Sequence, residues 1–186
     1  MRVIGGRFKG RRLHAPADLE IRPTISRLKE CYFNIVQERV PGARFLDLCA
    51  GTGSMGIEAL SRGAREAVFL DSGRQAEALI RRNLQICGVP EGARLITGDL
   101  FRELPRLGLE KVPFDLVYFD PPYFRGIYEH ALALVGAHGL LAADGLLAAN
   151  HFKKVVLPER VGPLGRVREV RQGDSVLAFY APLTSS

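Results

Sequence analysis

Four aspartates and one glycine-rich segment are the residues of this sequence best suited to chemistry. Asp47 opens the segment 47–56 (DLCAGTGSMG), and Asp71, Asp99 and Asp120 each follow a short apolar run further along the chain. A carboxylate accepts hydrogen bonds and attracts positive charge, and glycines allow a backbone to turn sharply against a ligand. These residues together are typical of a site that binds an adenosine-containing cofactor.

The glycine segment matches the pattern G-x-G-x-x-G at Gly51, Gly53 and Gly56 and lies between a predicted strand and a predicted helix. The start of that helix offers unpaired N–H groups and a positive dipole to an anionic group of a ligand. Asp71 ends the next predicted strand 20 residues after Gly51, where a carboxylate can accept both ribose hydroxyls. The loop alone is compatible with a nicotinamide dinucleotide or with S-adenosylmethionine.

Asp47 favours S-adenosylmethionine of these two cofactors. A carboxylate at the end of the strand opposes the pyrophosphate of a dinucleotide, but it suits an amino group and a sulfonium charge. Asp99 is placed to accept a hydrogen bond from the adenine amino group, or alternatively to cap the short helix that follows it. Gly51, Gly53 and Met55 complete the cofactor contacts that we expect from the loop.

The segment Asp120-Pro121-Pro122-Tyr123 directly follows the apolar run 114–119. Two prolines fix φ and remove two donors, so the chain forms a stiff arc with outward carbonyls. Asp120 and the Pro121 carbonyl can accept the two hydrogens of an exocyclic amino group, which frees the nitrogen lone pair to attack a methyl group. Tyr123 can stack on the base, a contact worth about 1–3 kcal/mol. Because Asp120 only accepts, it suits the adjacent N1–H and N2–H of guanine better than adenine.

The elements that must position these residues follow the alternation of an α/β domain with a mainly parallel sheet. Helices are predicted at 54–62 and at 74–87, where Gly88 is a stop signal. The last two predicted strands flank Gln172-Gly173-Asp174, which favours an antiparallel hairpin. The seven predicted strands span 45–49, 67–71, 94–97, 114–119, 145–150, 166–171 and 175–180.

Positive charge is concentrated in the first quarter of the 186-residue chain. Residues 1–44 carry ten Lys and Arg against four Asp and Glu, whereas residues 45–186 carry sixteen of each, for a net charge of +6. We predict a basic arm and helix at 1–44 that contact nucleic acid, and a catalytic domain at 45–186. The alternative is that these charges only solvate an exposed terminus. The residues predicted to contact RNA are Arg2, Arg7, Lys9, Arg11, Arg12, Arg22 and Arg27.

A helix is predicted at 25–36 within this basic part, with Ile25, Leu28, Cys31 or Tyr32, and Ile35 on its buried face. The chain's three cysteines show no metal-ligand spacing, so they are expected to be reduced thiols in a cytoplasmic protein without a metal. Charged or polar residues interrupt the longest apolar stretch, which argues against a membrane span. Without a coiled-coil pattern, a monomer is expected.

Several motifs spread over nearly the whole chain together resemble the bacterial RsmD family. They are RVIGG at 2–6, FKG at 8–10, RPT at 22–24 with Arg27 and Glu30, FNI at 33–35, the loop at 47–56, EALSRGA at 58–64 and DPPY at 120–123. The resemblance implies a Rossmann-like class I methyltransferase fold with a seven-stranded, mostly parallel sheet, a C-terminal antiparallel hairpin and a small basic N-terminal hairpin and helix.

The same resemblance implies transfer of a methyl group from S-adenosylmethionine to the exocyclic N2 of one guanine in 16S rRNA. The partner is then the small ribosomal subunit or its assembly intermediate. The resemblance assigns Asp47, Asp71 and Asp99 to the cofactor, and Asp120 and Tyr123 to the target base. Thr24, beside Arg22 and Arg27, is expected to close over the cofactor or the RNA. Cys49 and Asp71 are mild departures, because many relatives carry Phe and Glu there.

Three other functions remain open at this level. A DNA adenine-N6 methyltransferase shares the logic of Asp120–Tyr123, but the chain has little room for a DNA-recognition domain. A non-catalytic RNA-binding assembly factor would not need Asp47, Asp71 and Asp120 together. A nicotinamide-dependent oxidoreductase would need a proton donor near the loop, and none is obvious in the sequence.

Overall fold

The computed structural model describes residues 1–16, 23–89, 91–122 and 126–183, with the backbone alone at residues 23–25. Its centre is a sheet of eight strands in the order β3-β2-β1-β4-β5-β8-β7-β6. The strands are β1 (Arg44–Leu48), β2 (Glu66–Asp71), β3 (Ala93–Thr97), β4 (Phe114–Phe119), β5 (Leu141–Phe152), β6 (Arg160–Val161), β7 (Leu164–Gln172) and β8 (Ser175–Pro182). Strands β1 to β5 pair in parallel, and β5 to β8 pair antiparallel.

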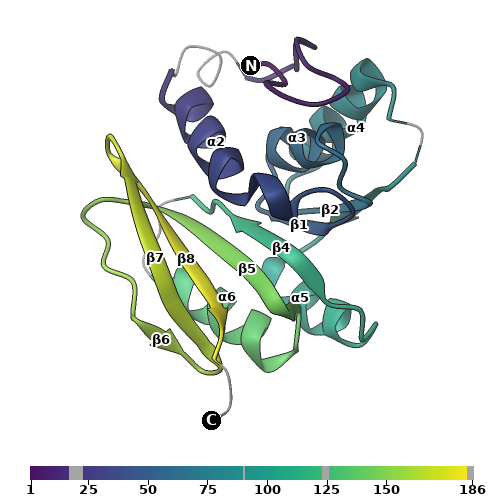
Figure 1. The fold of residues 1–186 in the computed structure, drawn as a ribbon. Coiled ribbons are helices and arrows are strands. Elements are labelled where there is room, and N and C mark those ends of the chain that lie inside the picture. Colours follow the sequence, from purple (N-terminus) through teal and green to yellow (C-terminus); the bar gives the residue numbers. More distant parts are fainter. Residues whose placement is uncertain (17–22, 90, 123–125, 184–186) are drawn as a thin grey trace.

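Helices cover both faces of this sheet (Figure 1). Helices α2 (Pro23–Val36), α3 (Ser54–Ser61) and α4 (Arg74–Cys87) pack on one face, and α5 (Leu100–Gly108) and α6 (Ile127–Ala137) pack on the other. Successive residues of a strand point to opposite faces, so Phe45 belongs to the first core and Leu46 to the second. Burial on both faces explains why β1 and β4 are almost continuously apolar.

The order of the strands creates a switch point between β1 and β4. From β1 the chain proceeds outward to β2 and β3, and it then returns to place β4 on the other side of β1. The loops that follow β1 and β4 therefore leave the same edge of the sheet in opposite directions. A crevice at such a point is the usual ligand site of an open α/β sheet.

The predicted fold class is confirmed, with two differences in detail. The sheet has eight strands, not seven, because the two-residue strand β6 pairs with β7 at the edge. Helix α6 was not predicted as a separate element, because its apolar residues run into those of β5 and show no clear period. The predicted C-terminal hairpin is formed by β7 and β8, but its turn contains only Gly173 and Asp174, because Gln172 already belongs to β7.

The first sixteen residues fold back onto the domain. Arg2 and Arg12 form an isolated antiparallel bridge, which confirms a hairpin in minimal form, and the side chains of Val3 and Leu13 are buried in the core that α2, α3 and α4 share. The hydrophobic core therefore does not divide at residue 45. The assignment of separate roles to 1–44 and 45–186 stays a prediction about function.

Helix α2 buries a broader face than predicted. Leu28 and Tyr32 are buried as expected, but Lys29 and Phe33 are buried as well, while Ile35 is only partly buried. The predicted face was too narrow because a charged residue such as Lys29 is expected to face solvent unless a buried partner is known.

That partner is Glu58 of α3, which is completely buried. Its carboxylate accepts hydrogen bonds from the backbone N–H groups of Ile4 (2.8 Å) and Gly5 (2.7 Å). It also pairs with Arg62 at 2.9 Å and with Lys29 at 3.4 Å. We call these five residues the Glu58 network, which joins the N-terminal hairpin, α2 and α3.

Candidate active site

A cavity of about 750 Å³ opens where β1 and β4 end. Its floor includes Asp47 of β1 and Asp120 just after β4, and the loop from Cys49 to Met55 forms one side. Helix α2 contributes Leu28 and Lys29 to the wall. The remaining lining residues come mainly from the segment after Asp120, the end of β5 and the β7–β8 turn: Pro121, Pro122, Asn150, Phe152, Asp174 and Ser175. The sequence-predicted cofactor loop and base-binding segment thus share one cavity.

The three glycines of the loop have different structural tasks. Gly51 and Gly53 have φ values of +55° and +72°, a backbone conformation that favours glycine. Gly56 lies inside α3 with an ordinary backbone, but a Cβ there would come within 2.3 Å of the Phe69 ring. The first two glycines therefore shape the turn, and the third brings α3 close to β2. The buried amide of Asn83 in α4 also holds this turn, because it donates to the Thr52 carbonyl at 2.9 Å.

Asp47 is buried below the loop, with 2% of its surface exposed. Its Oδ2 accepts a hydrogen bond from the Gly56 N–H at 2.9 Å, which ties the end of β1 to the first turn of α3. Burial raises the pKa of Asp47 well above its ordinary value, and the nearby charges of Asp120 and Asp71 raise it further, against the opposing Gly56 bond. A positive charge in the cavity would stabilise the ionised form of Asp47 and lower its pKa.

Asp71 stands at the end of β2 with both carboxylate oxygens in use. Oδ2 accepts from the Gly51 N–H at 2.8 Å, and Oδ1 accepts from the Gly73 N–H at 2.9 Å. Each oxygen retains a second lone pair, so these bonds fix the carboxylate while leaving acceptor capacity. The side chain is half-buried and sits at the same strand-end edge as the loop.

Asp99 is an exposed helix cap in the structure. It is the N-cap of α5, and its Oδ1 accepts from the Arg102 N–H at 3.1 Å. The capping alternative raised by the sequence is therefore what the structure shows. Asp99 and Asp71 are not among the residues that line the cavity in the described part of the chain.

Asp120 lines the cavity, and its surface is exposed there. The protein atoms around the carboxylate still remove part of its hydration, and this desolvation raises the pKa of Asp120 to about 6, while a hydrogen bond from Asn150 partly opposes the increase. The Asp120 N–H still reaches the Leu48 carbonyl of β1 at 3.3 Å, so the residue is held at the sheet edge. Pro121 is buried beside it.

Asn150 is a site residue to which the sequence analysis assigned no role. It lies near the end of β5, and its Nδ2 donates to Asp120 Oδ1 at 2.8 Å. A polar residue at the end of the apolar run 146–149 is the signal that could have found it. Its partner becomes evident only from the register, which pairs Phe119 with Ala149 and so places Asn150 level with Asp120.

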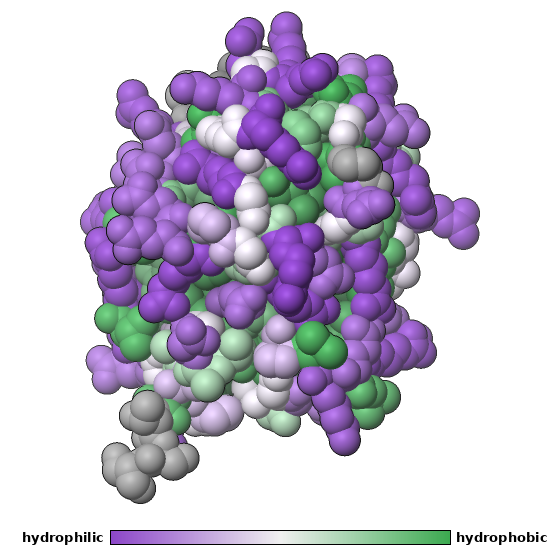
Figure 2. Space-filling view, turned by 45° about the vertical axis from the view of Figure 1, so that its right-hand side comes forward, coloured by the Kyte–Doolittle hydropathy of each residue, from purple (hydrophilic) through white to green (hydrophobic). Residues whose placement is uncertain are grey.

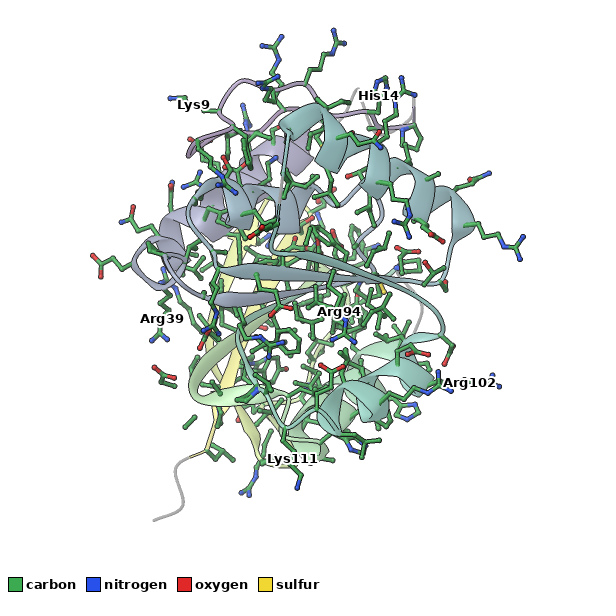
Figure 3. All side chains as sticks on the ribbon, turned by 90° about the vertical axis from the view of Figure 1, so that its right-hand side faces the viewer. Lys9, His14, Arg39, Arg94, Arg102 and Lys111 are labelled. Carbon is green, nitrogen blue, oxygen red and sulfur yellow. The ribbon has the colours of Figure 1, made fainter. Side chains whose placement is uncertain are left out.

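The N-terminal cationic residues predicted to contact RNA are exposed wherever the structure describes them: Arg2, Arg7, Lys9, Arg11, Arg12 and Arg27. Lys9 points away from the body of the protein at the end that carries the hairpin (Figure 3). Two other basic residues of this part, Lys29 and Arg44, are buried in ion pairs and do not contribute to such a surface. Figure 2 shows hydrophilic side chains over most of one face, with hydrophobic ones in small separate patches.

Three of the predicted site residues cannot be located. Arg22 and Tyr123 lie outside the described residues, and of Thr24 the backbone alone is described, in the first turn of α2. Their assigned roles stay predictions.

The described residues show neither a metal site nor a membrane-spanning helix. No group of three or more His, Cys, Asp and Glu side chains there could hold a metal ion. Among the same residues, no helix combines the length and apolar composition needed to cross a bilayer.

Comparison with known proteins shows similarity over nearly the full chain. The model of the family described as "Conserved hypothetical protein 95" matches residues 1–181. The chain is 37% identical over 180 residues to "Putative rRNA methyltransferase YlbH" of Bacillus subtilis (strain 168), which covers 97% of this chain and 98% of that protein. It is 33% identical to "Ribosomal RNA small subunit methyltransferase D" of Escherichia coli (strain K12), over 79% of this chain and 72% of the relative.

A solved structure gives the same result for the fold. The structure titled "Putative methyltransferase yhhF from Escherichia coli" superposes with a TM-score of 0.85 at 29% identity, over 100% of this chain and 99% of that one.

Proposed function

This chain belongs to the RsmD family, described as conserved hypothetical protein 95, and we propose that it transfers a methyl group from S-adenosylmethionine to a guanine in ribosomal RNA of the small subunit. The acceptor atom is the exocyclic N2. The observation that carries the proposal is the single cavity in which Asp120 and Pro121 lie across from Asp47 and the glycine loop. One cavity thus contains a carboxylate that can attract a cation, Asp47, and acceptors suited to the amino group of a base, Asp120 and the Pro121 carbonyl.

The chain's residues fit the cofactor by charge and by shape. Asp47 is buried without a cation among the described residues and faces the cavity, where the amino group and sulfonium of S-adenosylmethionine would compensate it. The positive-φ turn at Gly51 and Gly53 lets the ligand approach the backbone, and Met55 lines the same wall. When bound, the cofactor supplies a methyl group made electrophilic by its sulfonium.

Two further carboxylates are assigned to the adenosine part of the cofactor. Asp71 retains acceptor capacity for the ribose hydroxyls, and its bonds to Gly51 and Gly73 preset its orientation. Asp99 caps α5 through Oδ1, and only its second oxygen, Oδ2, is proposed to accept from the adenine amino group. Thr24 is proposed to complete this side of the site.

The base is held by acceptors on the other side of the cavity. Asp120, with a pKa of about 6, is ionised at neutral pH and accepts from the guanine amino group, together with the Pro121 carbonyl. These bonds direct the nitrogen lone pair toward the methyl group, so the N2–C bond forms as the C–S bond breaks. The displaced proton passes to Asp120 or to water. Tyr123 is proposed to stack on the base, which must leave its stack to reach the cavity.

The RNA around the target base is proposed to contact the exposed cations of the first part of the chain: Arg2, Arg7, Lys9, Arg11, Arg12, Arg22 and Arg27. Arginine suits phosphate because its planar guanidinium donates two parallel hydrogen bonds. The hairpin that carries most of these residues is fixed to α3 by the Glu58 network, so it can present them in a defined place. We propose that the protein acts as a monomer in the cytoplasm, on the small ribosomal subunit or its assembly intermediate.

The proposal is tested with S-adenosylmethionine labelled in its methyl group. The protein is incubated in parallel with small ribosomal subunits lacking the modification, with free 16S rRNA and with duplex DNA, and label in each nucleic acid is counted. We expect label in the subunit or the free rRNA and none in DNA. Label in DNA alone would favour an adenine-N6 methyltransferase, and tight cofactor binding without transfer would favour a non-catalytic assembly factor.

A further inference from the structure

Asn150 stands next to the reacting side chain without belonging to any motif of the site. Strand β4 ends at Phe119, whereas its neighbour β5 continues to Phe152. The parallel register pairs Phe119 with Ala149, so the next residue of each strand, Asp120 and Asn150, lies at the same level. The extension of β5 past the end of β4 therefore brings a side chain beside Asp120 exactly where the sheet opens into the cavity.

The contact between these two residues has a fixed direction. Asn150 Nδ2 donates to Asp120 Oδ1 at 2.8 Å, and the opposite amide orientation would place two oxygens against each other. Only 3% of Asn150 is exposed, and its backbone carbonyl accepts from the Tyr128 hydroxyl of α6 at 3.1 Å. The amide thus approaches Asp120 from a rigid, buried position.

The contact between Asn150 and Asp120 leaves one buried polar atom of Asn150 without a hydrogen bond to the described residues. Asn150 Oδ1 is buried and has no hydrogen-bond partner among the described residues. Buried polar atoms in native proteins are nearly always satisfied, so an unsatisfied one calls for an explanation. An apolar side chain of similar size would fill the position without an orphaned oxygen, but it would leave Asp120 without its side-chain donor.

From this geometry we infer that Asn150 is a positioning residue of the methyl-transfer site, whose amide occupies one oxygen of Asp120 and orients the other toward the guanine amino group. The inference rests on the proposed function. It assigns to Asn150 no contact with the base, and it explains why Asp120 meets the substrate in one orientation.

The amide affects the charge of Asp120 as well as its orientation. Asp47 of β1 lies close enough to Asp120 and to Asp71, the last residue of β2, to interact electrostatically with both. Desolvation favours the protonated form of Asp120, and the Asn150 bond favours the carboxylate. A protonated Asp120 would offer a donor where the guanine amino group needs an acceptor.

The first test measures Asp120 itself and does not depend on activity. The carboxyl group is titrated by carbon-13 NMR in the cofactor-free protein, in wild type and in Asn150→Leu. We expect a pKa of about 6 in wild type and a value higher by at least about half a unit in the variant, because a stabilising hydrogen bond is lost. Asn34→Leu removes an exposed amide of α2 that does not line the cavity, and it should leave the Asp120 titration unchanged. An equal Asp120 pKa in wild type and Asn150→Leu would overturn the inference.

The second test measures single-turnover methyl transfer against pH with saturating cofactor. Asn150→Leu should slow transfer at least about tenfold near pH 7, because a misplaced catalytic group can cost about a hundredfold. The range over which transfer rises with pH should lie higher in Asn150→Leu than in wild type, and cofactor affinity should stay within about threefold. Asn150→Asp, which keeps the size of the side chain, should be slower still because it adds a second carboxylate.

The outcomes separate this inference from the proposed function. If wild type transfers label to RNA and Asp120→Ala does not, but both Asn150 variants keep the wild-type rate and pH profile, only the role of Asn150 is wrong. If wild type transfers no label to any RNA, the proposed function fails, while the NMR titration still decides whether the amide controls Asp120.

Discussion

The carboxylates of the Glu58 network and of the cavity differ in the partners that the protein gives them. Glu58 accepts from two backbone N–H groups and pairs with two cations, Lys29 and Arg62. Asp47 accepts from one N–H and Asp120 from one amide, and no cation within the described residues pairs with either.

The partners of a carboxylate indicate whether it stabilises the fold or is available to bind a ligand. Burying a charge is tolerable when its partners come from the protein, and such a group then stabilises one packing arrangement. Desolvation raises the pKa of a carboxylate that has no cation beside it, as it does for the buried Asp47 and for Asp120 in the cavity wall. Such a group is available to a positively charged ligand, and this contrast supports our proposal that S-adenosylmethionine binds in the cavity and not at the Glu58 network.

The largest effect expected from this contrast is on the rate of methyl transfer. Asp120→Asn keeps the shape of the side chain but removes the charge and replaces one acceptor by donors. Transfer should fall about a thousandfold or more, while cofactor affinity changes only a few-fold, as measured by single-turnover kinetics and calorimetry. Loss of cofactor binding as the main effect would show that Asp120 belongs to the cofactor side of the cavity.

The next effect concerns stability and should appear only at the Glu58 network. Glu58→Ala leaves Lys29 buried without its counterion, which costs about 3–5 kcal/mol in the free energy of unfolding. Chemical denaturation of the cofactor-free protein measures this cost, and Lys29→Met in the same chain should recover part of it. Asp120→Asn is the matched control, because removing one of several nearby carboxylates should not destabilise. Equal destabilisation by Glu58→Ala and Asp120→Asn would remove the distinction between the two groups.

A third effect is a pKa change in the cavity when cofactor binds. Asp120 titrates at about 6 in the free protein, and the positive sulfonium should stabilise its carboxylate form and lower this pKa by about one unit. Activity that depends on ionised Asp120 then rises with pH over a range below 6 when cofactor is saturating. S-adenosylhomocysteine, whose sulfur is neutral, should lower the Asp120 pKa less in the same NMR titration. An equal shift with both ligands would place the sulfonium away from Asp120.

The smallest effect is on RNA binding by the hairpin. Arg7, Lys9 and Arg12 are exposed, so replacing all three with Gln should leave the melting temperature unchanged. The slope of log affinity against log salt concentration should fall by about 2, close to 0.7 for each lost contact with single-stranded phosphate. Deletion of residues 1–12 is a poorer test, because it also removes Val3 and two partners of Glu58. An unchanged slope in the triple variant would reject the hairpin as a phosphate contact.

The sequence predicted most of the sheet, because its central strands have strong local signals. The strand 114–119 and the helix 74–87 agree with the structure residue by residue, helped by a continuous apolar run in one and by Gly88 in the other. Strand β6 was not predicted because a strand of two residues is too short to show an alternation of apolar and polar side chains. Helix α6 was missed because its apolar residues are continuous with those that follow.

The site was predictable only where chemistry coincides with a motif. Asp47, the glycine loop and Asp120 stand out by type and spacing, and the structure brings them to one cavity. Lys29 and Asn150 do not stand out, because their roles depend on partners 29 and 30 residues away along the chain, Glu58 and Asp120. Burial of a lysine or an orphaned amide oxygen is a property of the packed structure.

The most direct test of the central claim identifies the methylated atom. RNA from unmodified small subunits is treated with the protein and S-adenosylmethionine, digested to nucleosides and analysed by mass spectrometry against authentic standards. The cavity, with an acceptor-only Asp120 beside a site for a cationic cofactor, predicts N2-methylguanosine, and predicts its absence with Asp120→Asn. N6-methyladenosine as the sole product, or N2-methylguanosine formed equally well by Asp120→Asn, would contradict the account.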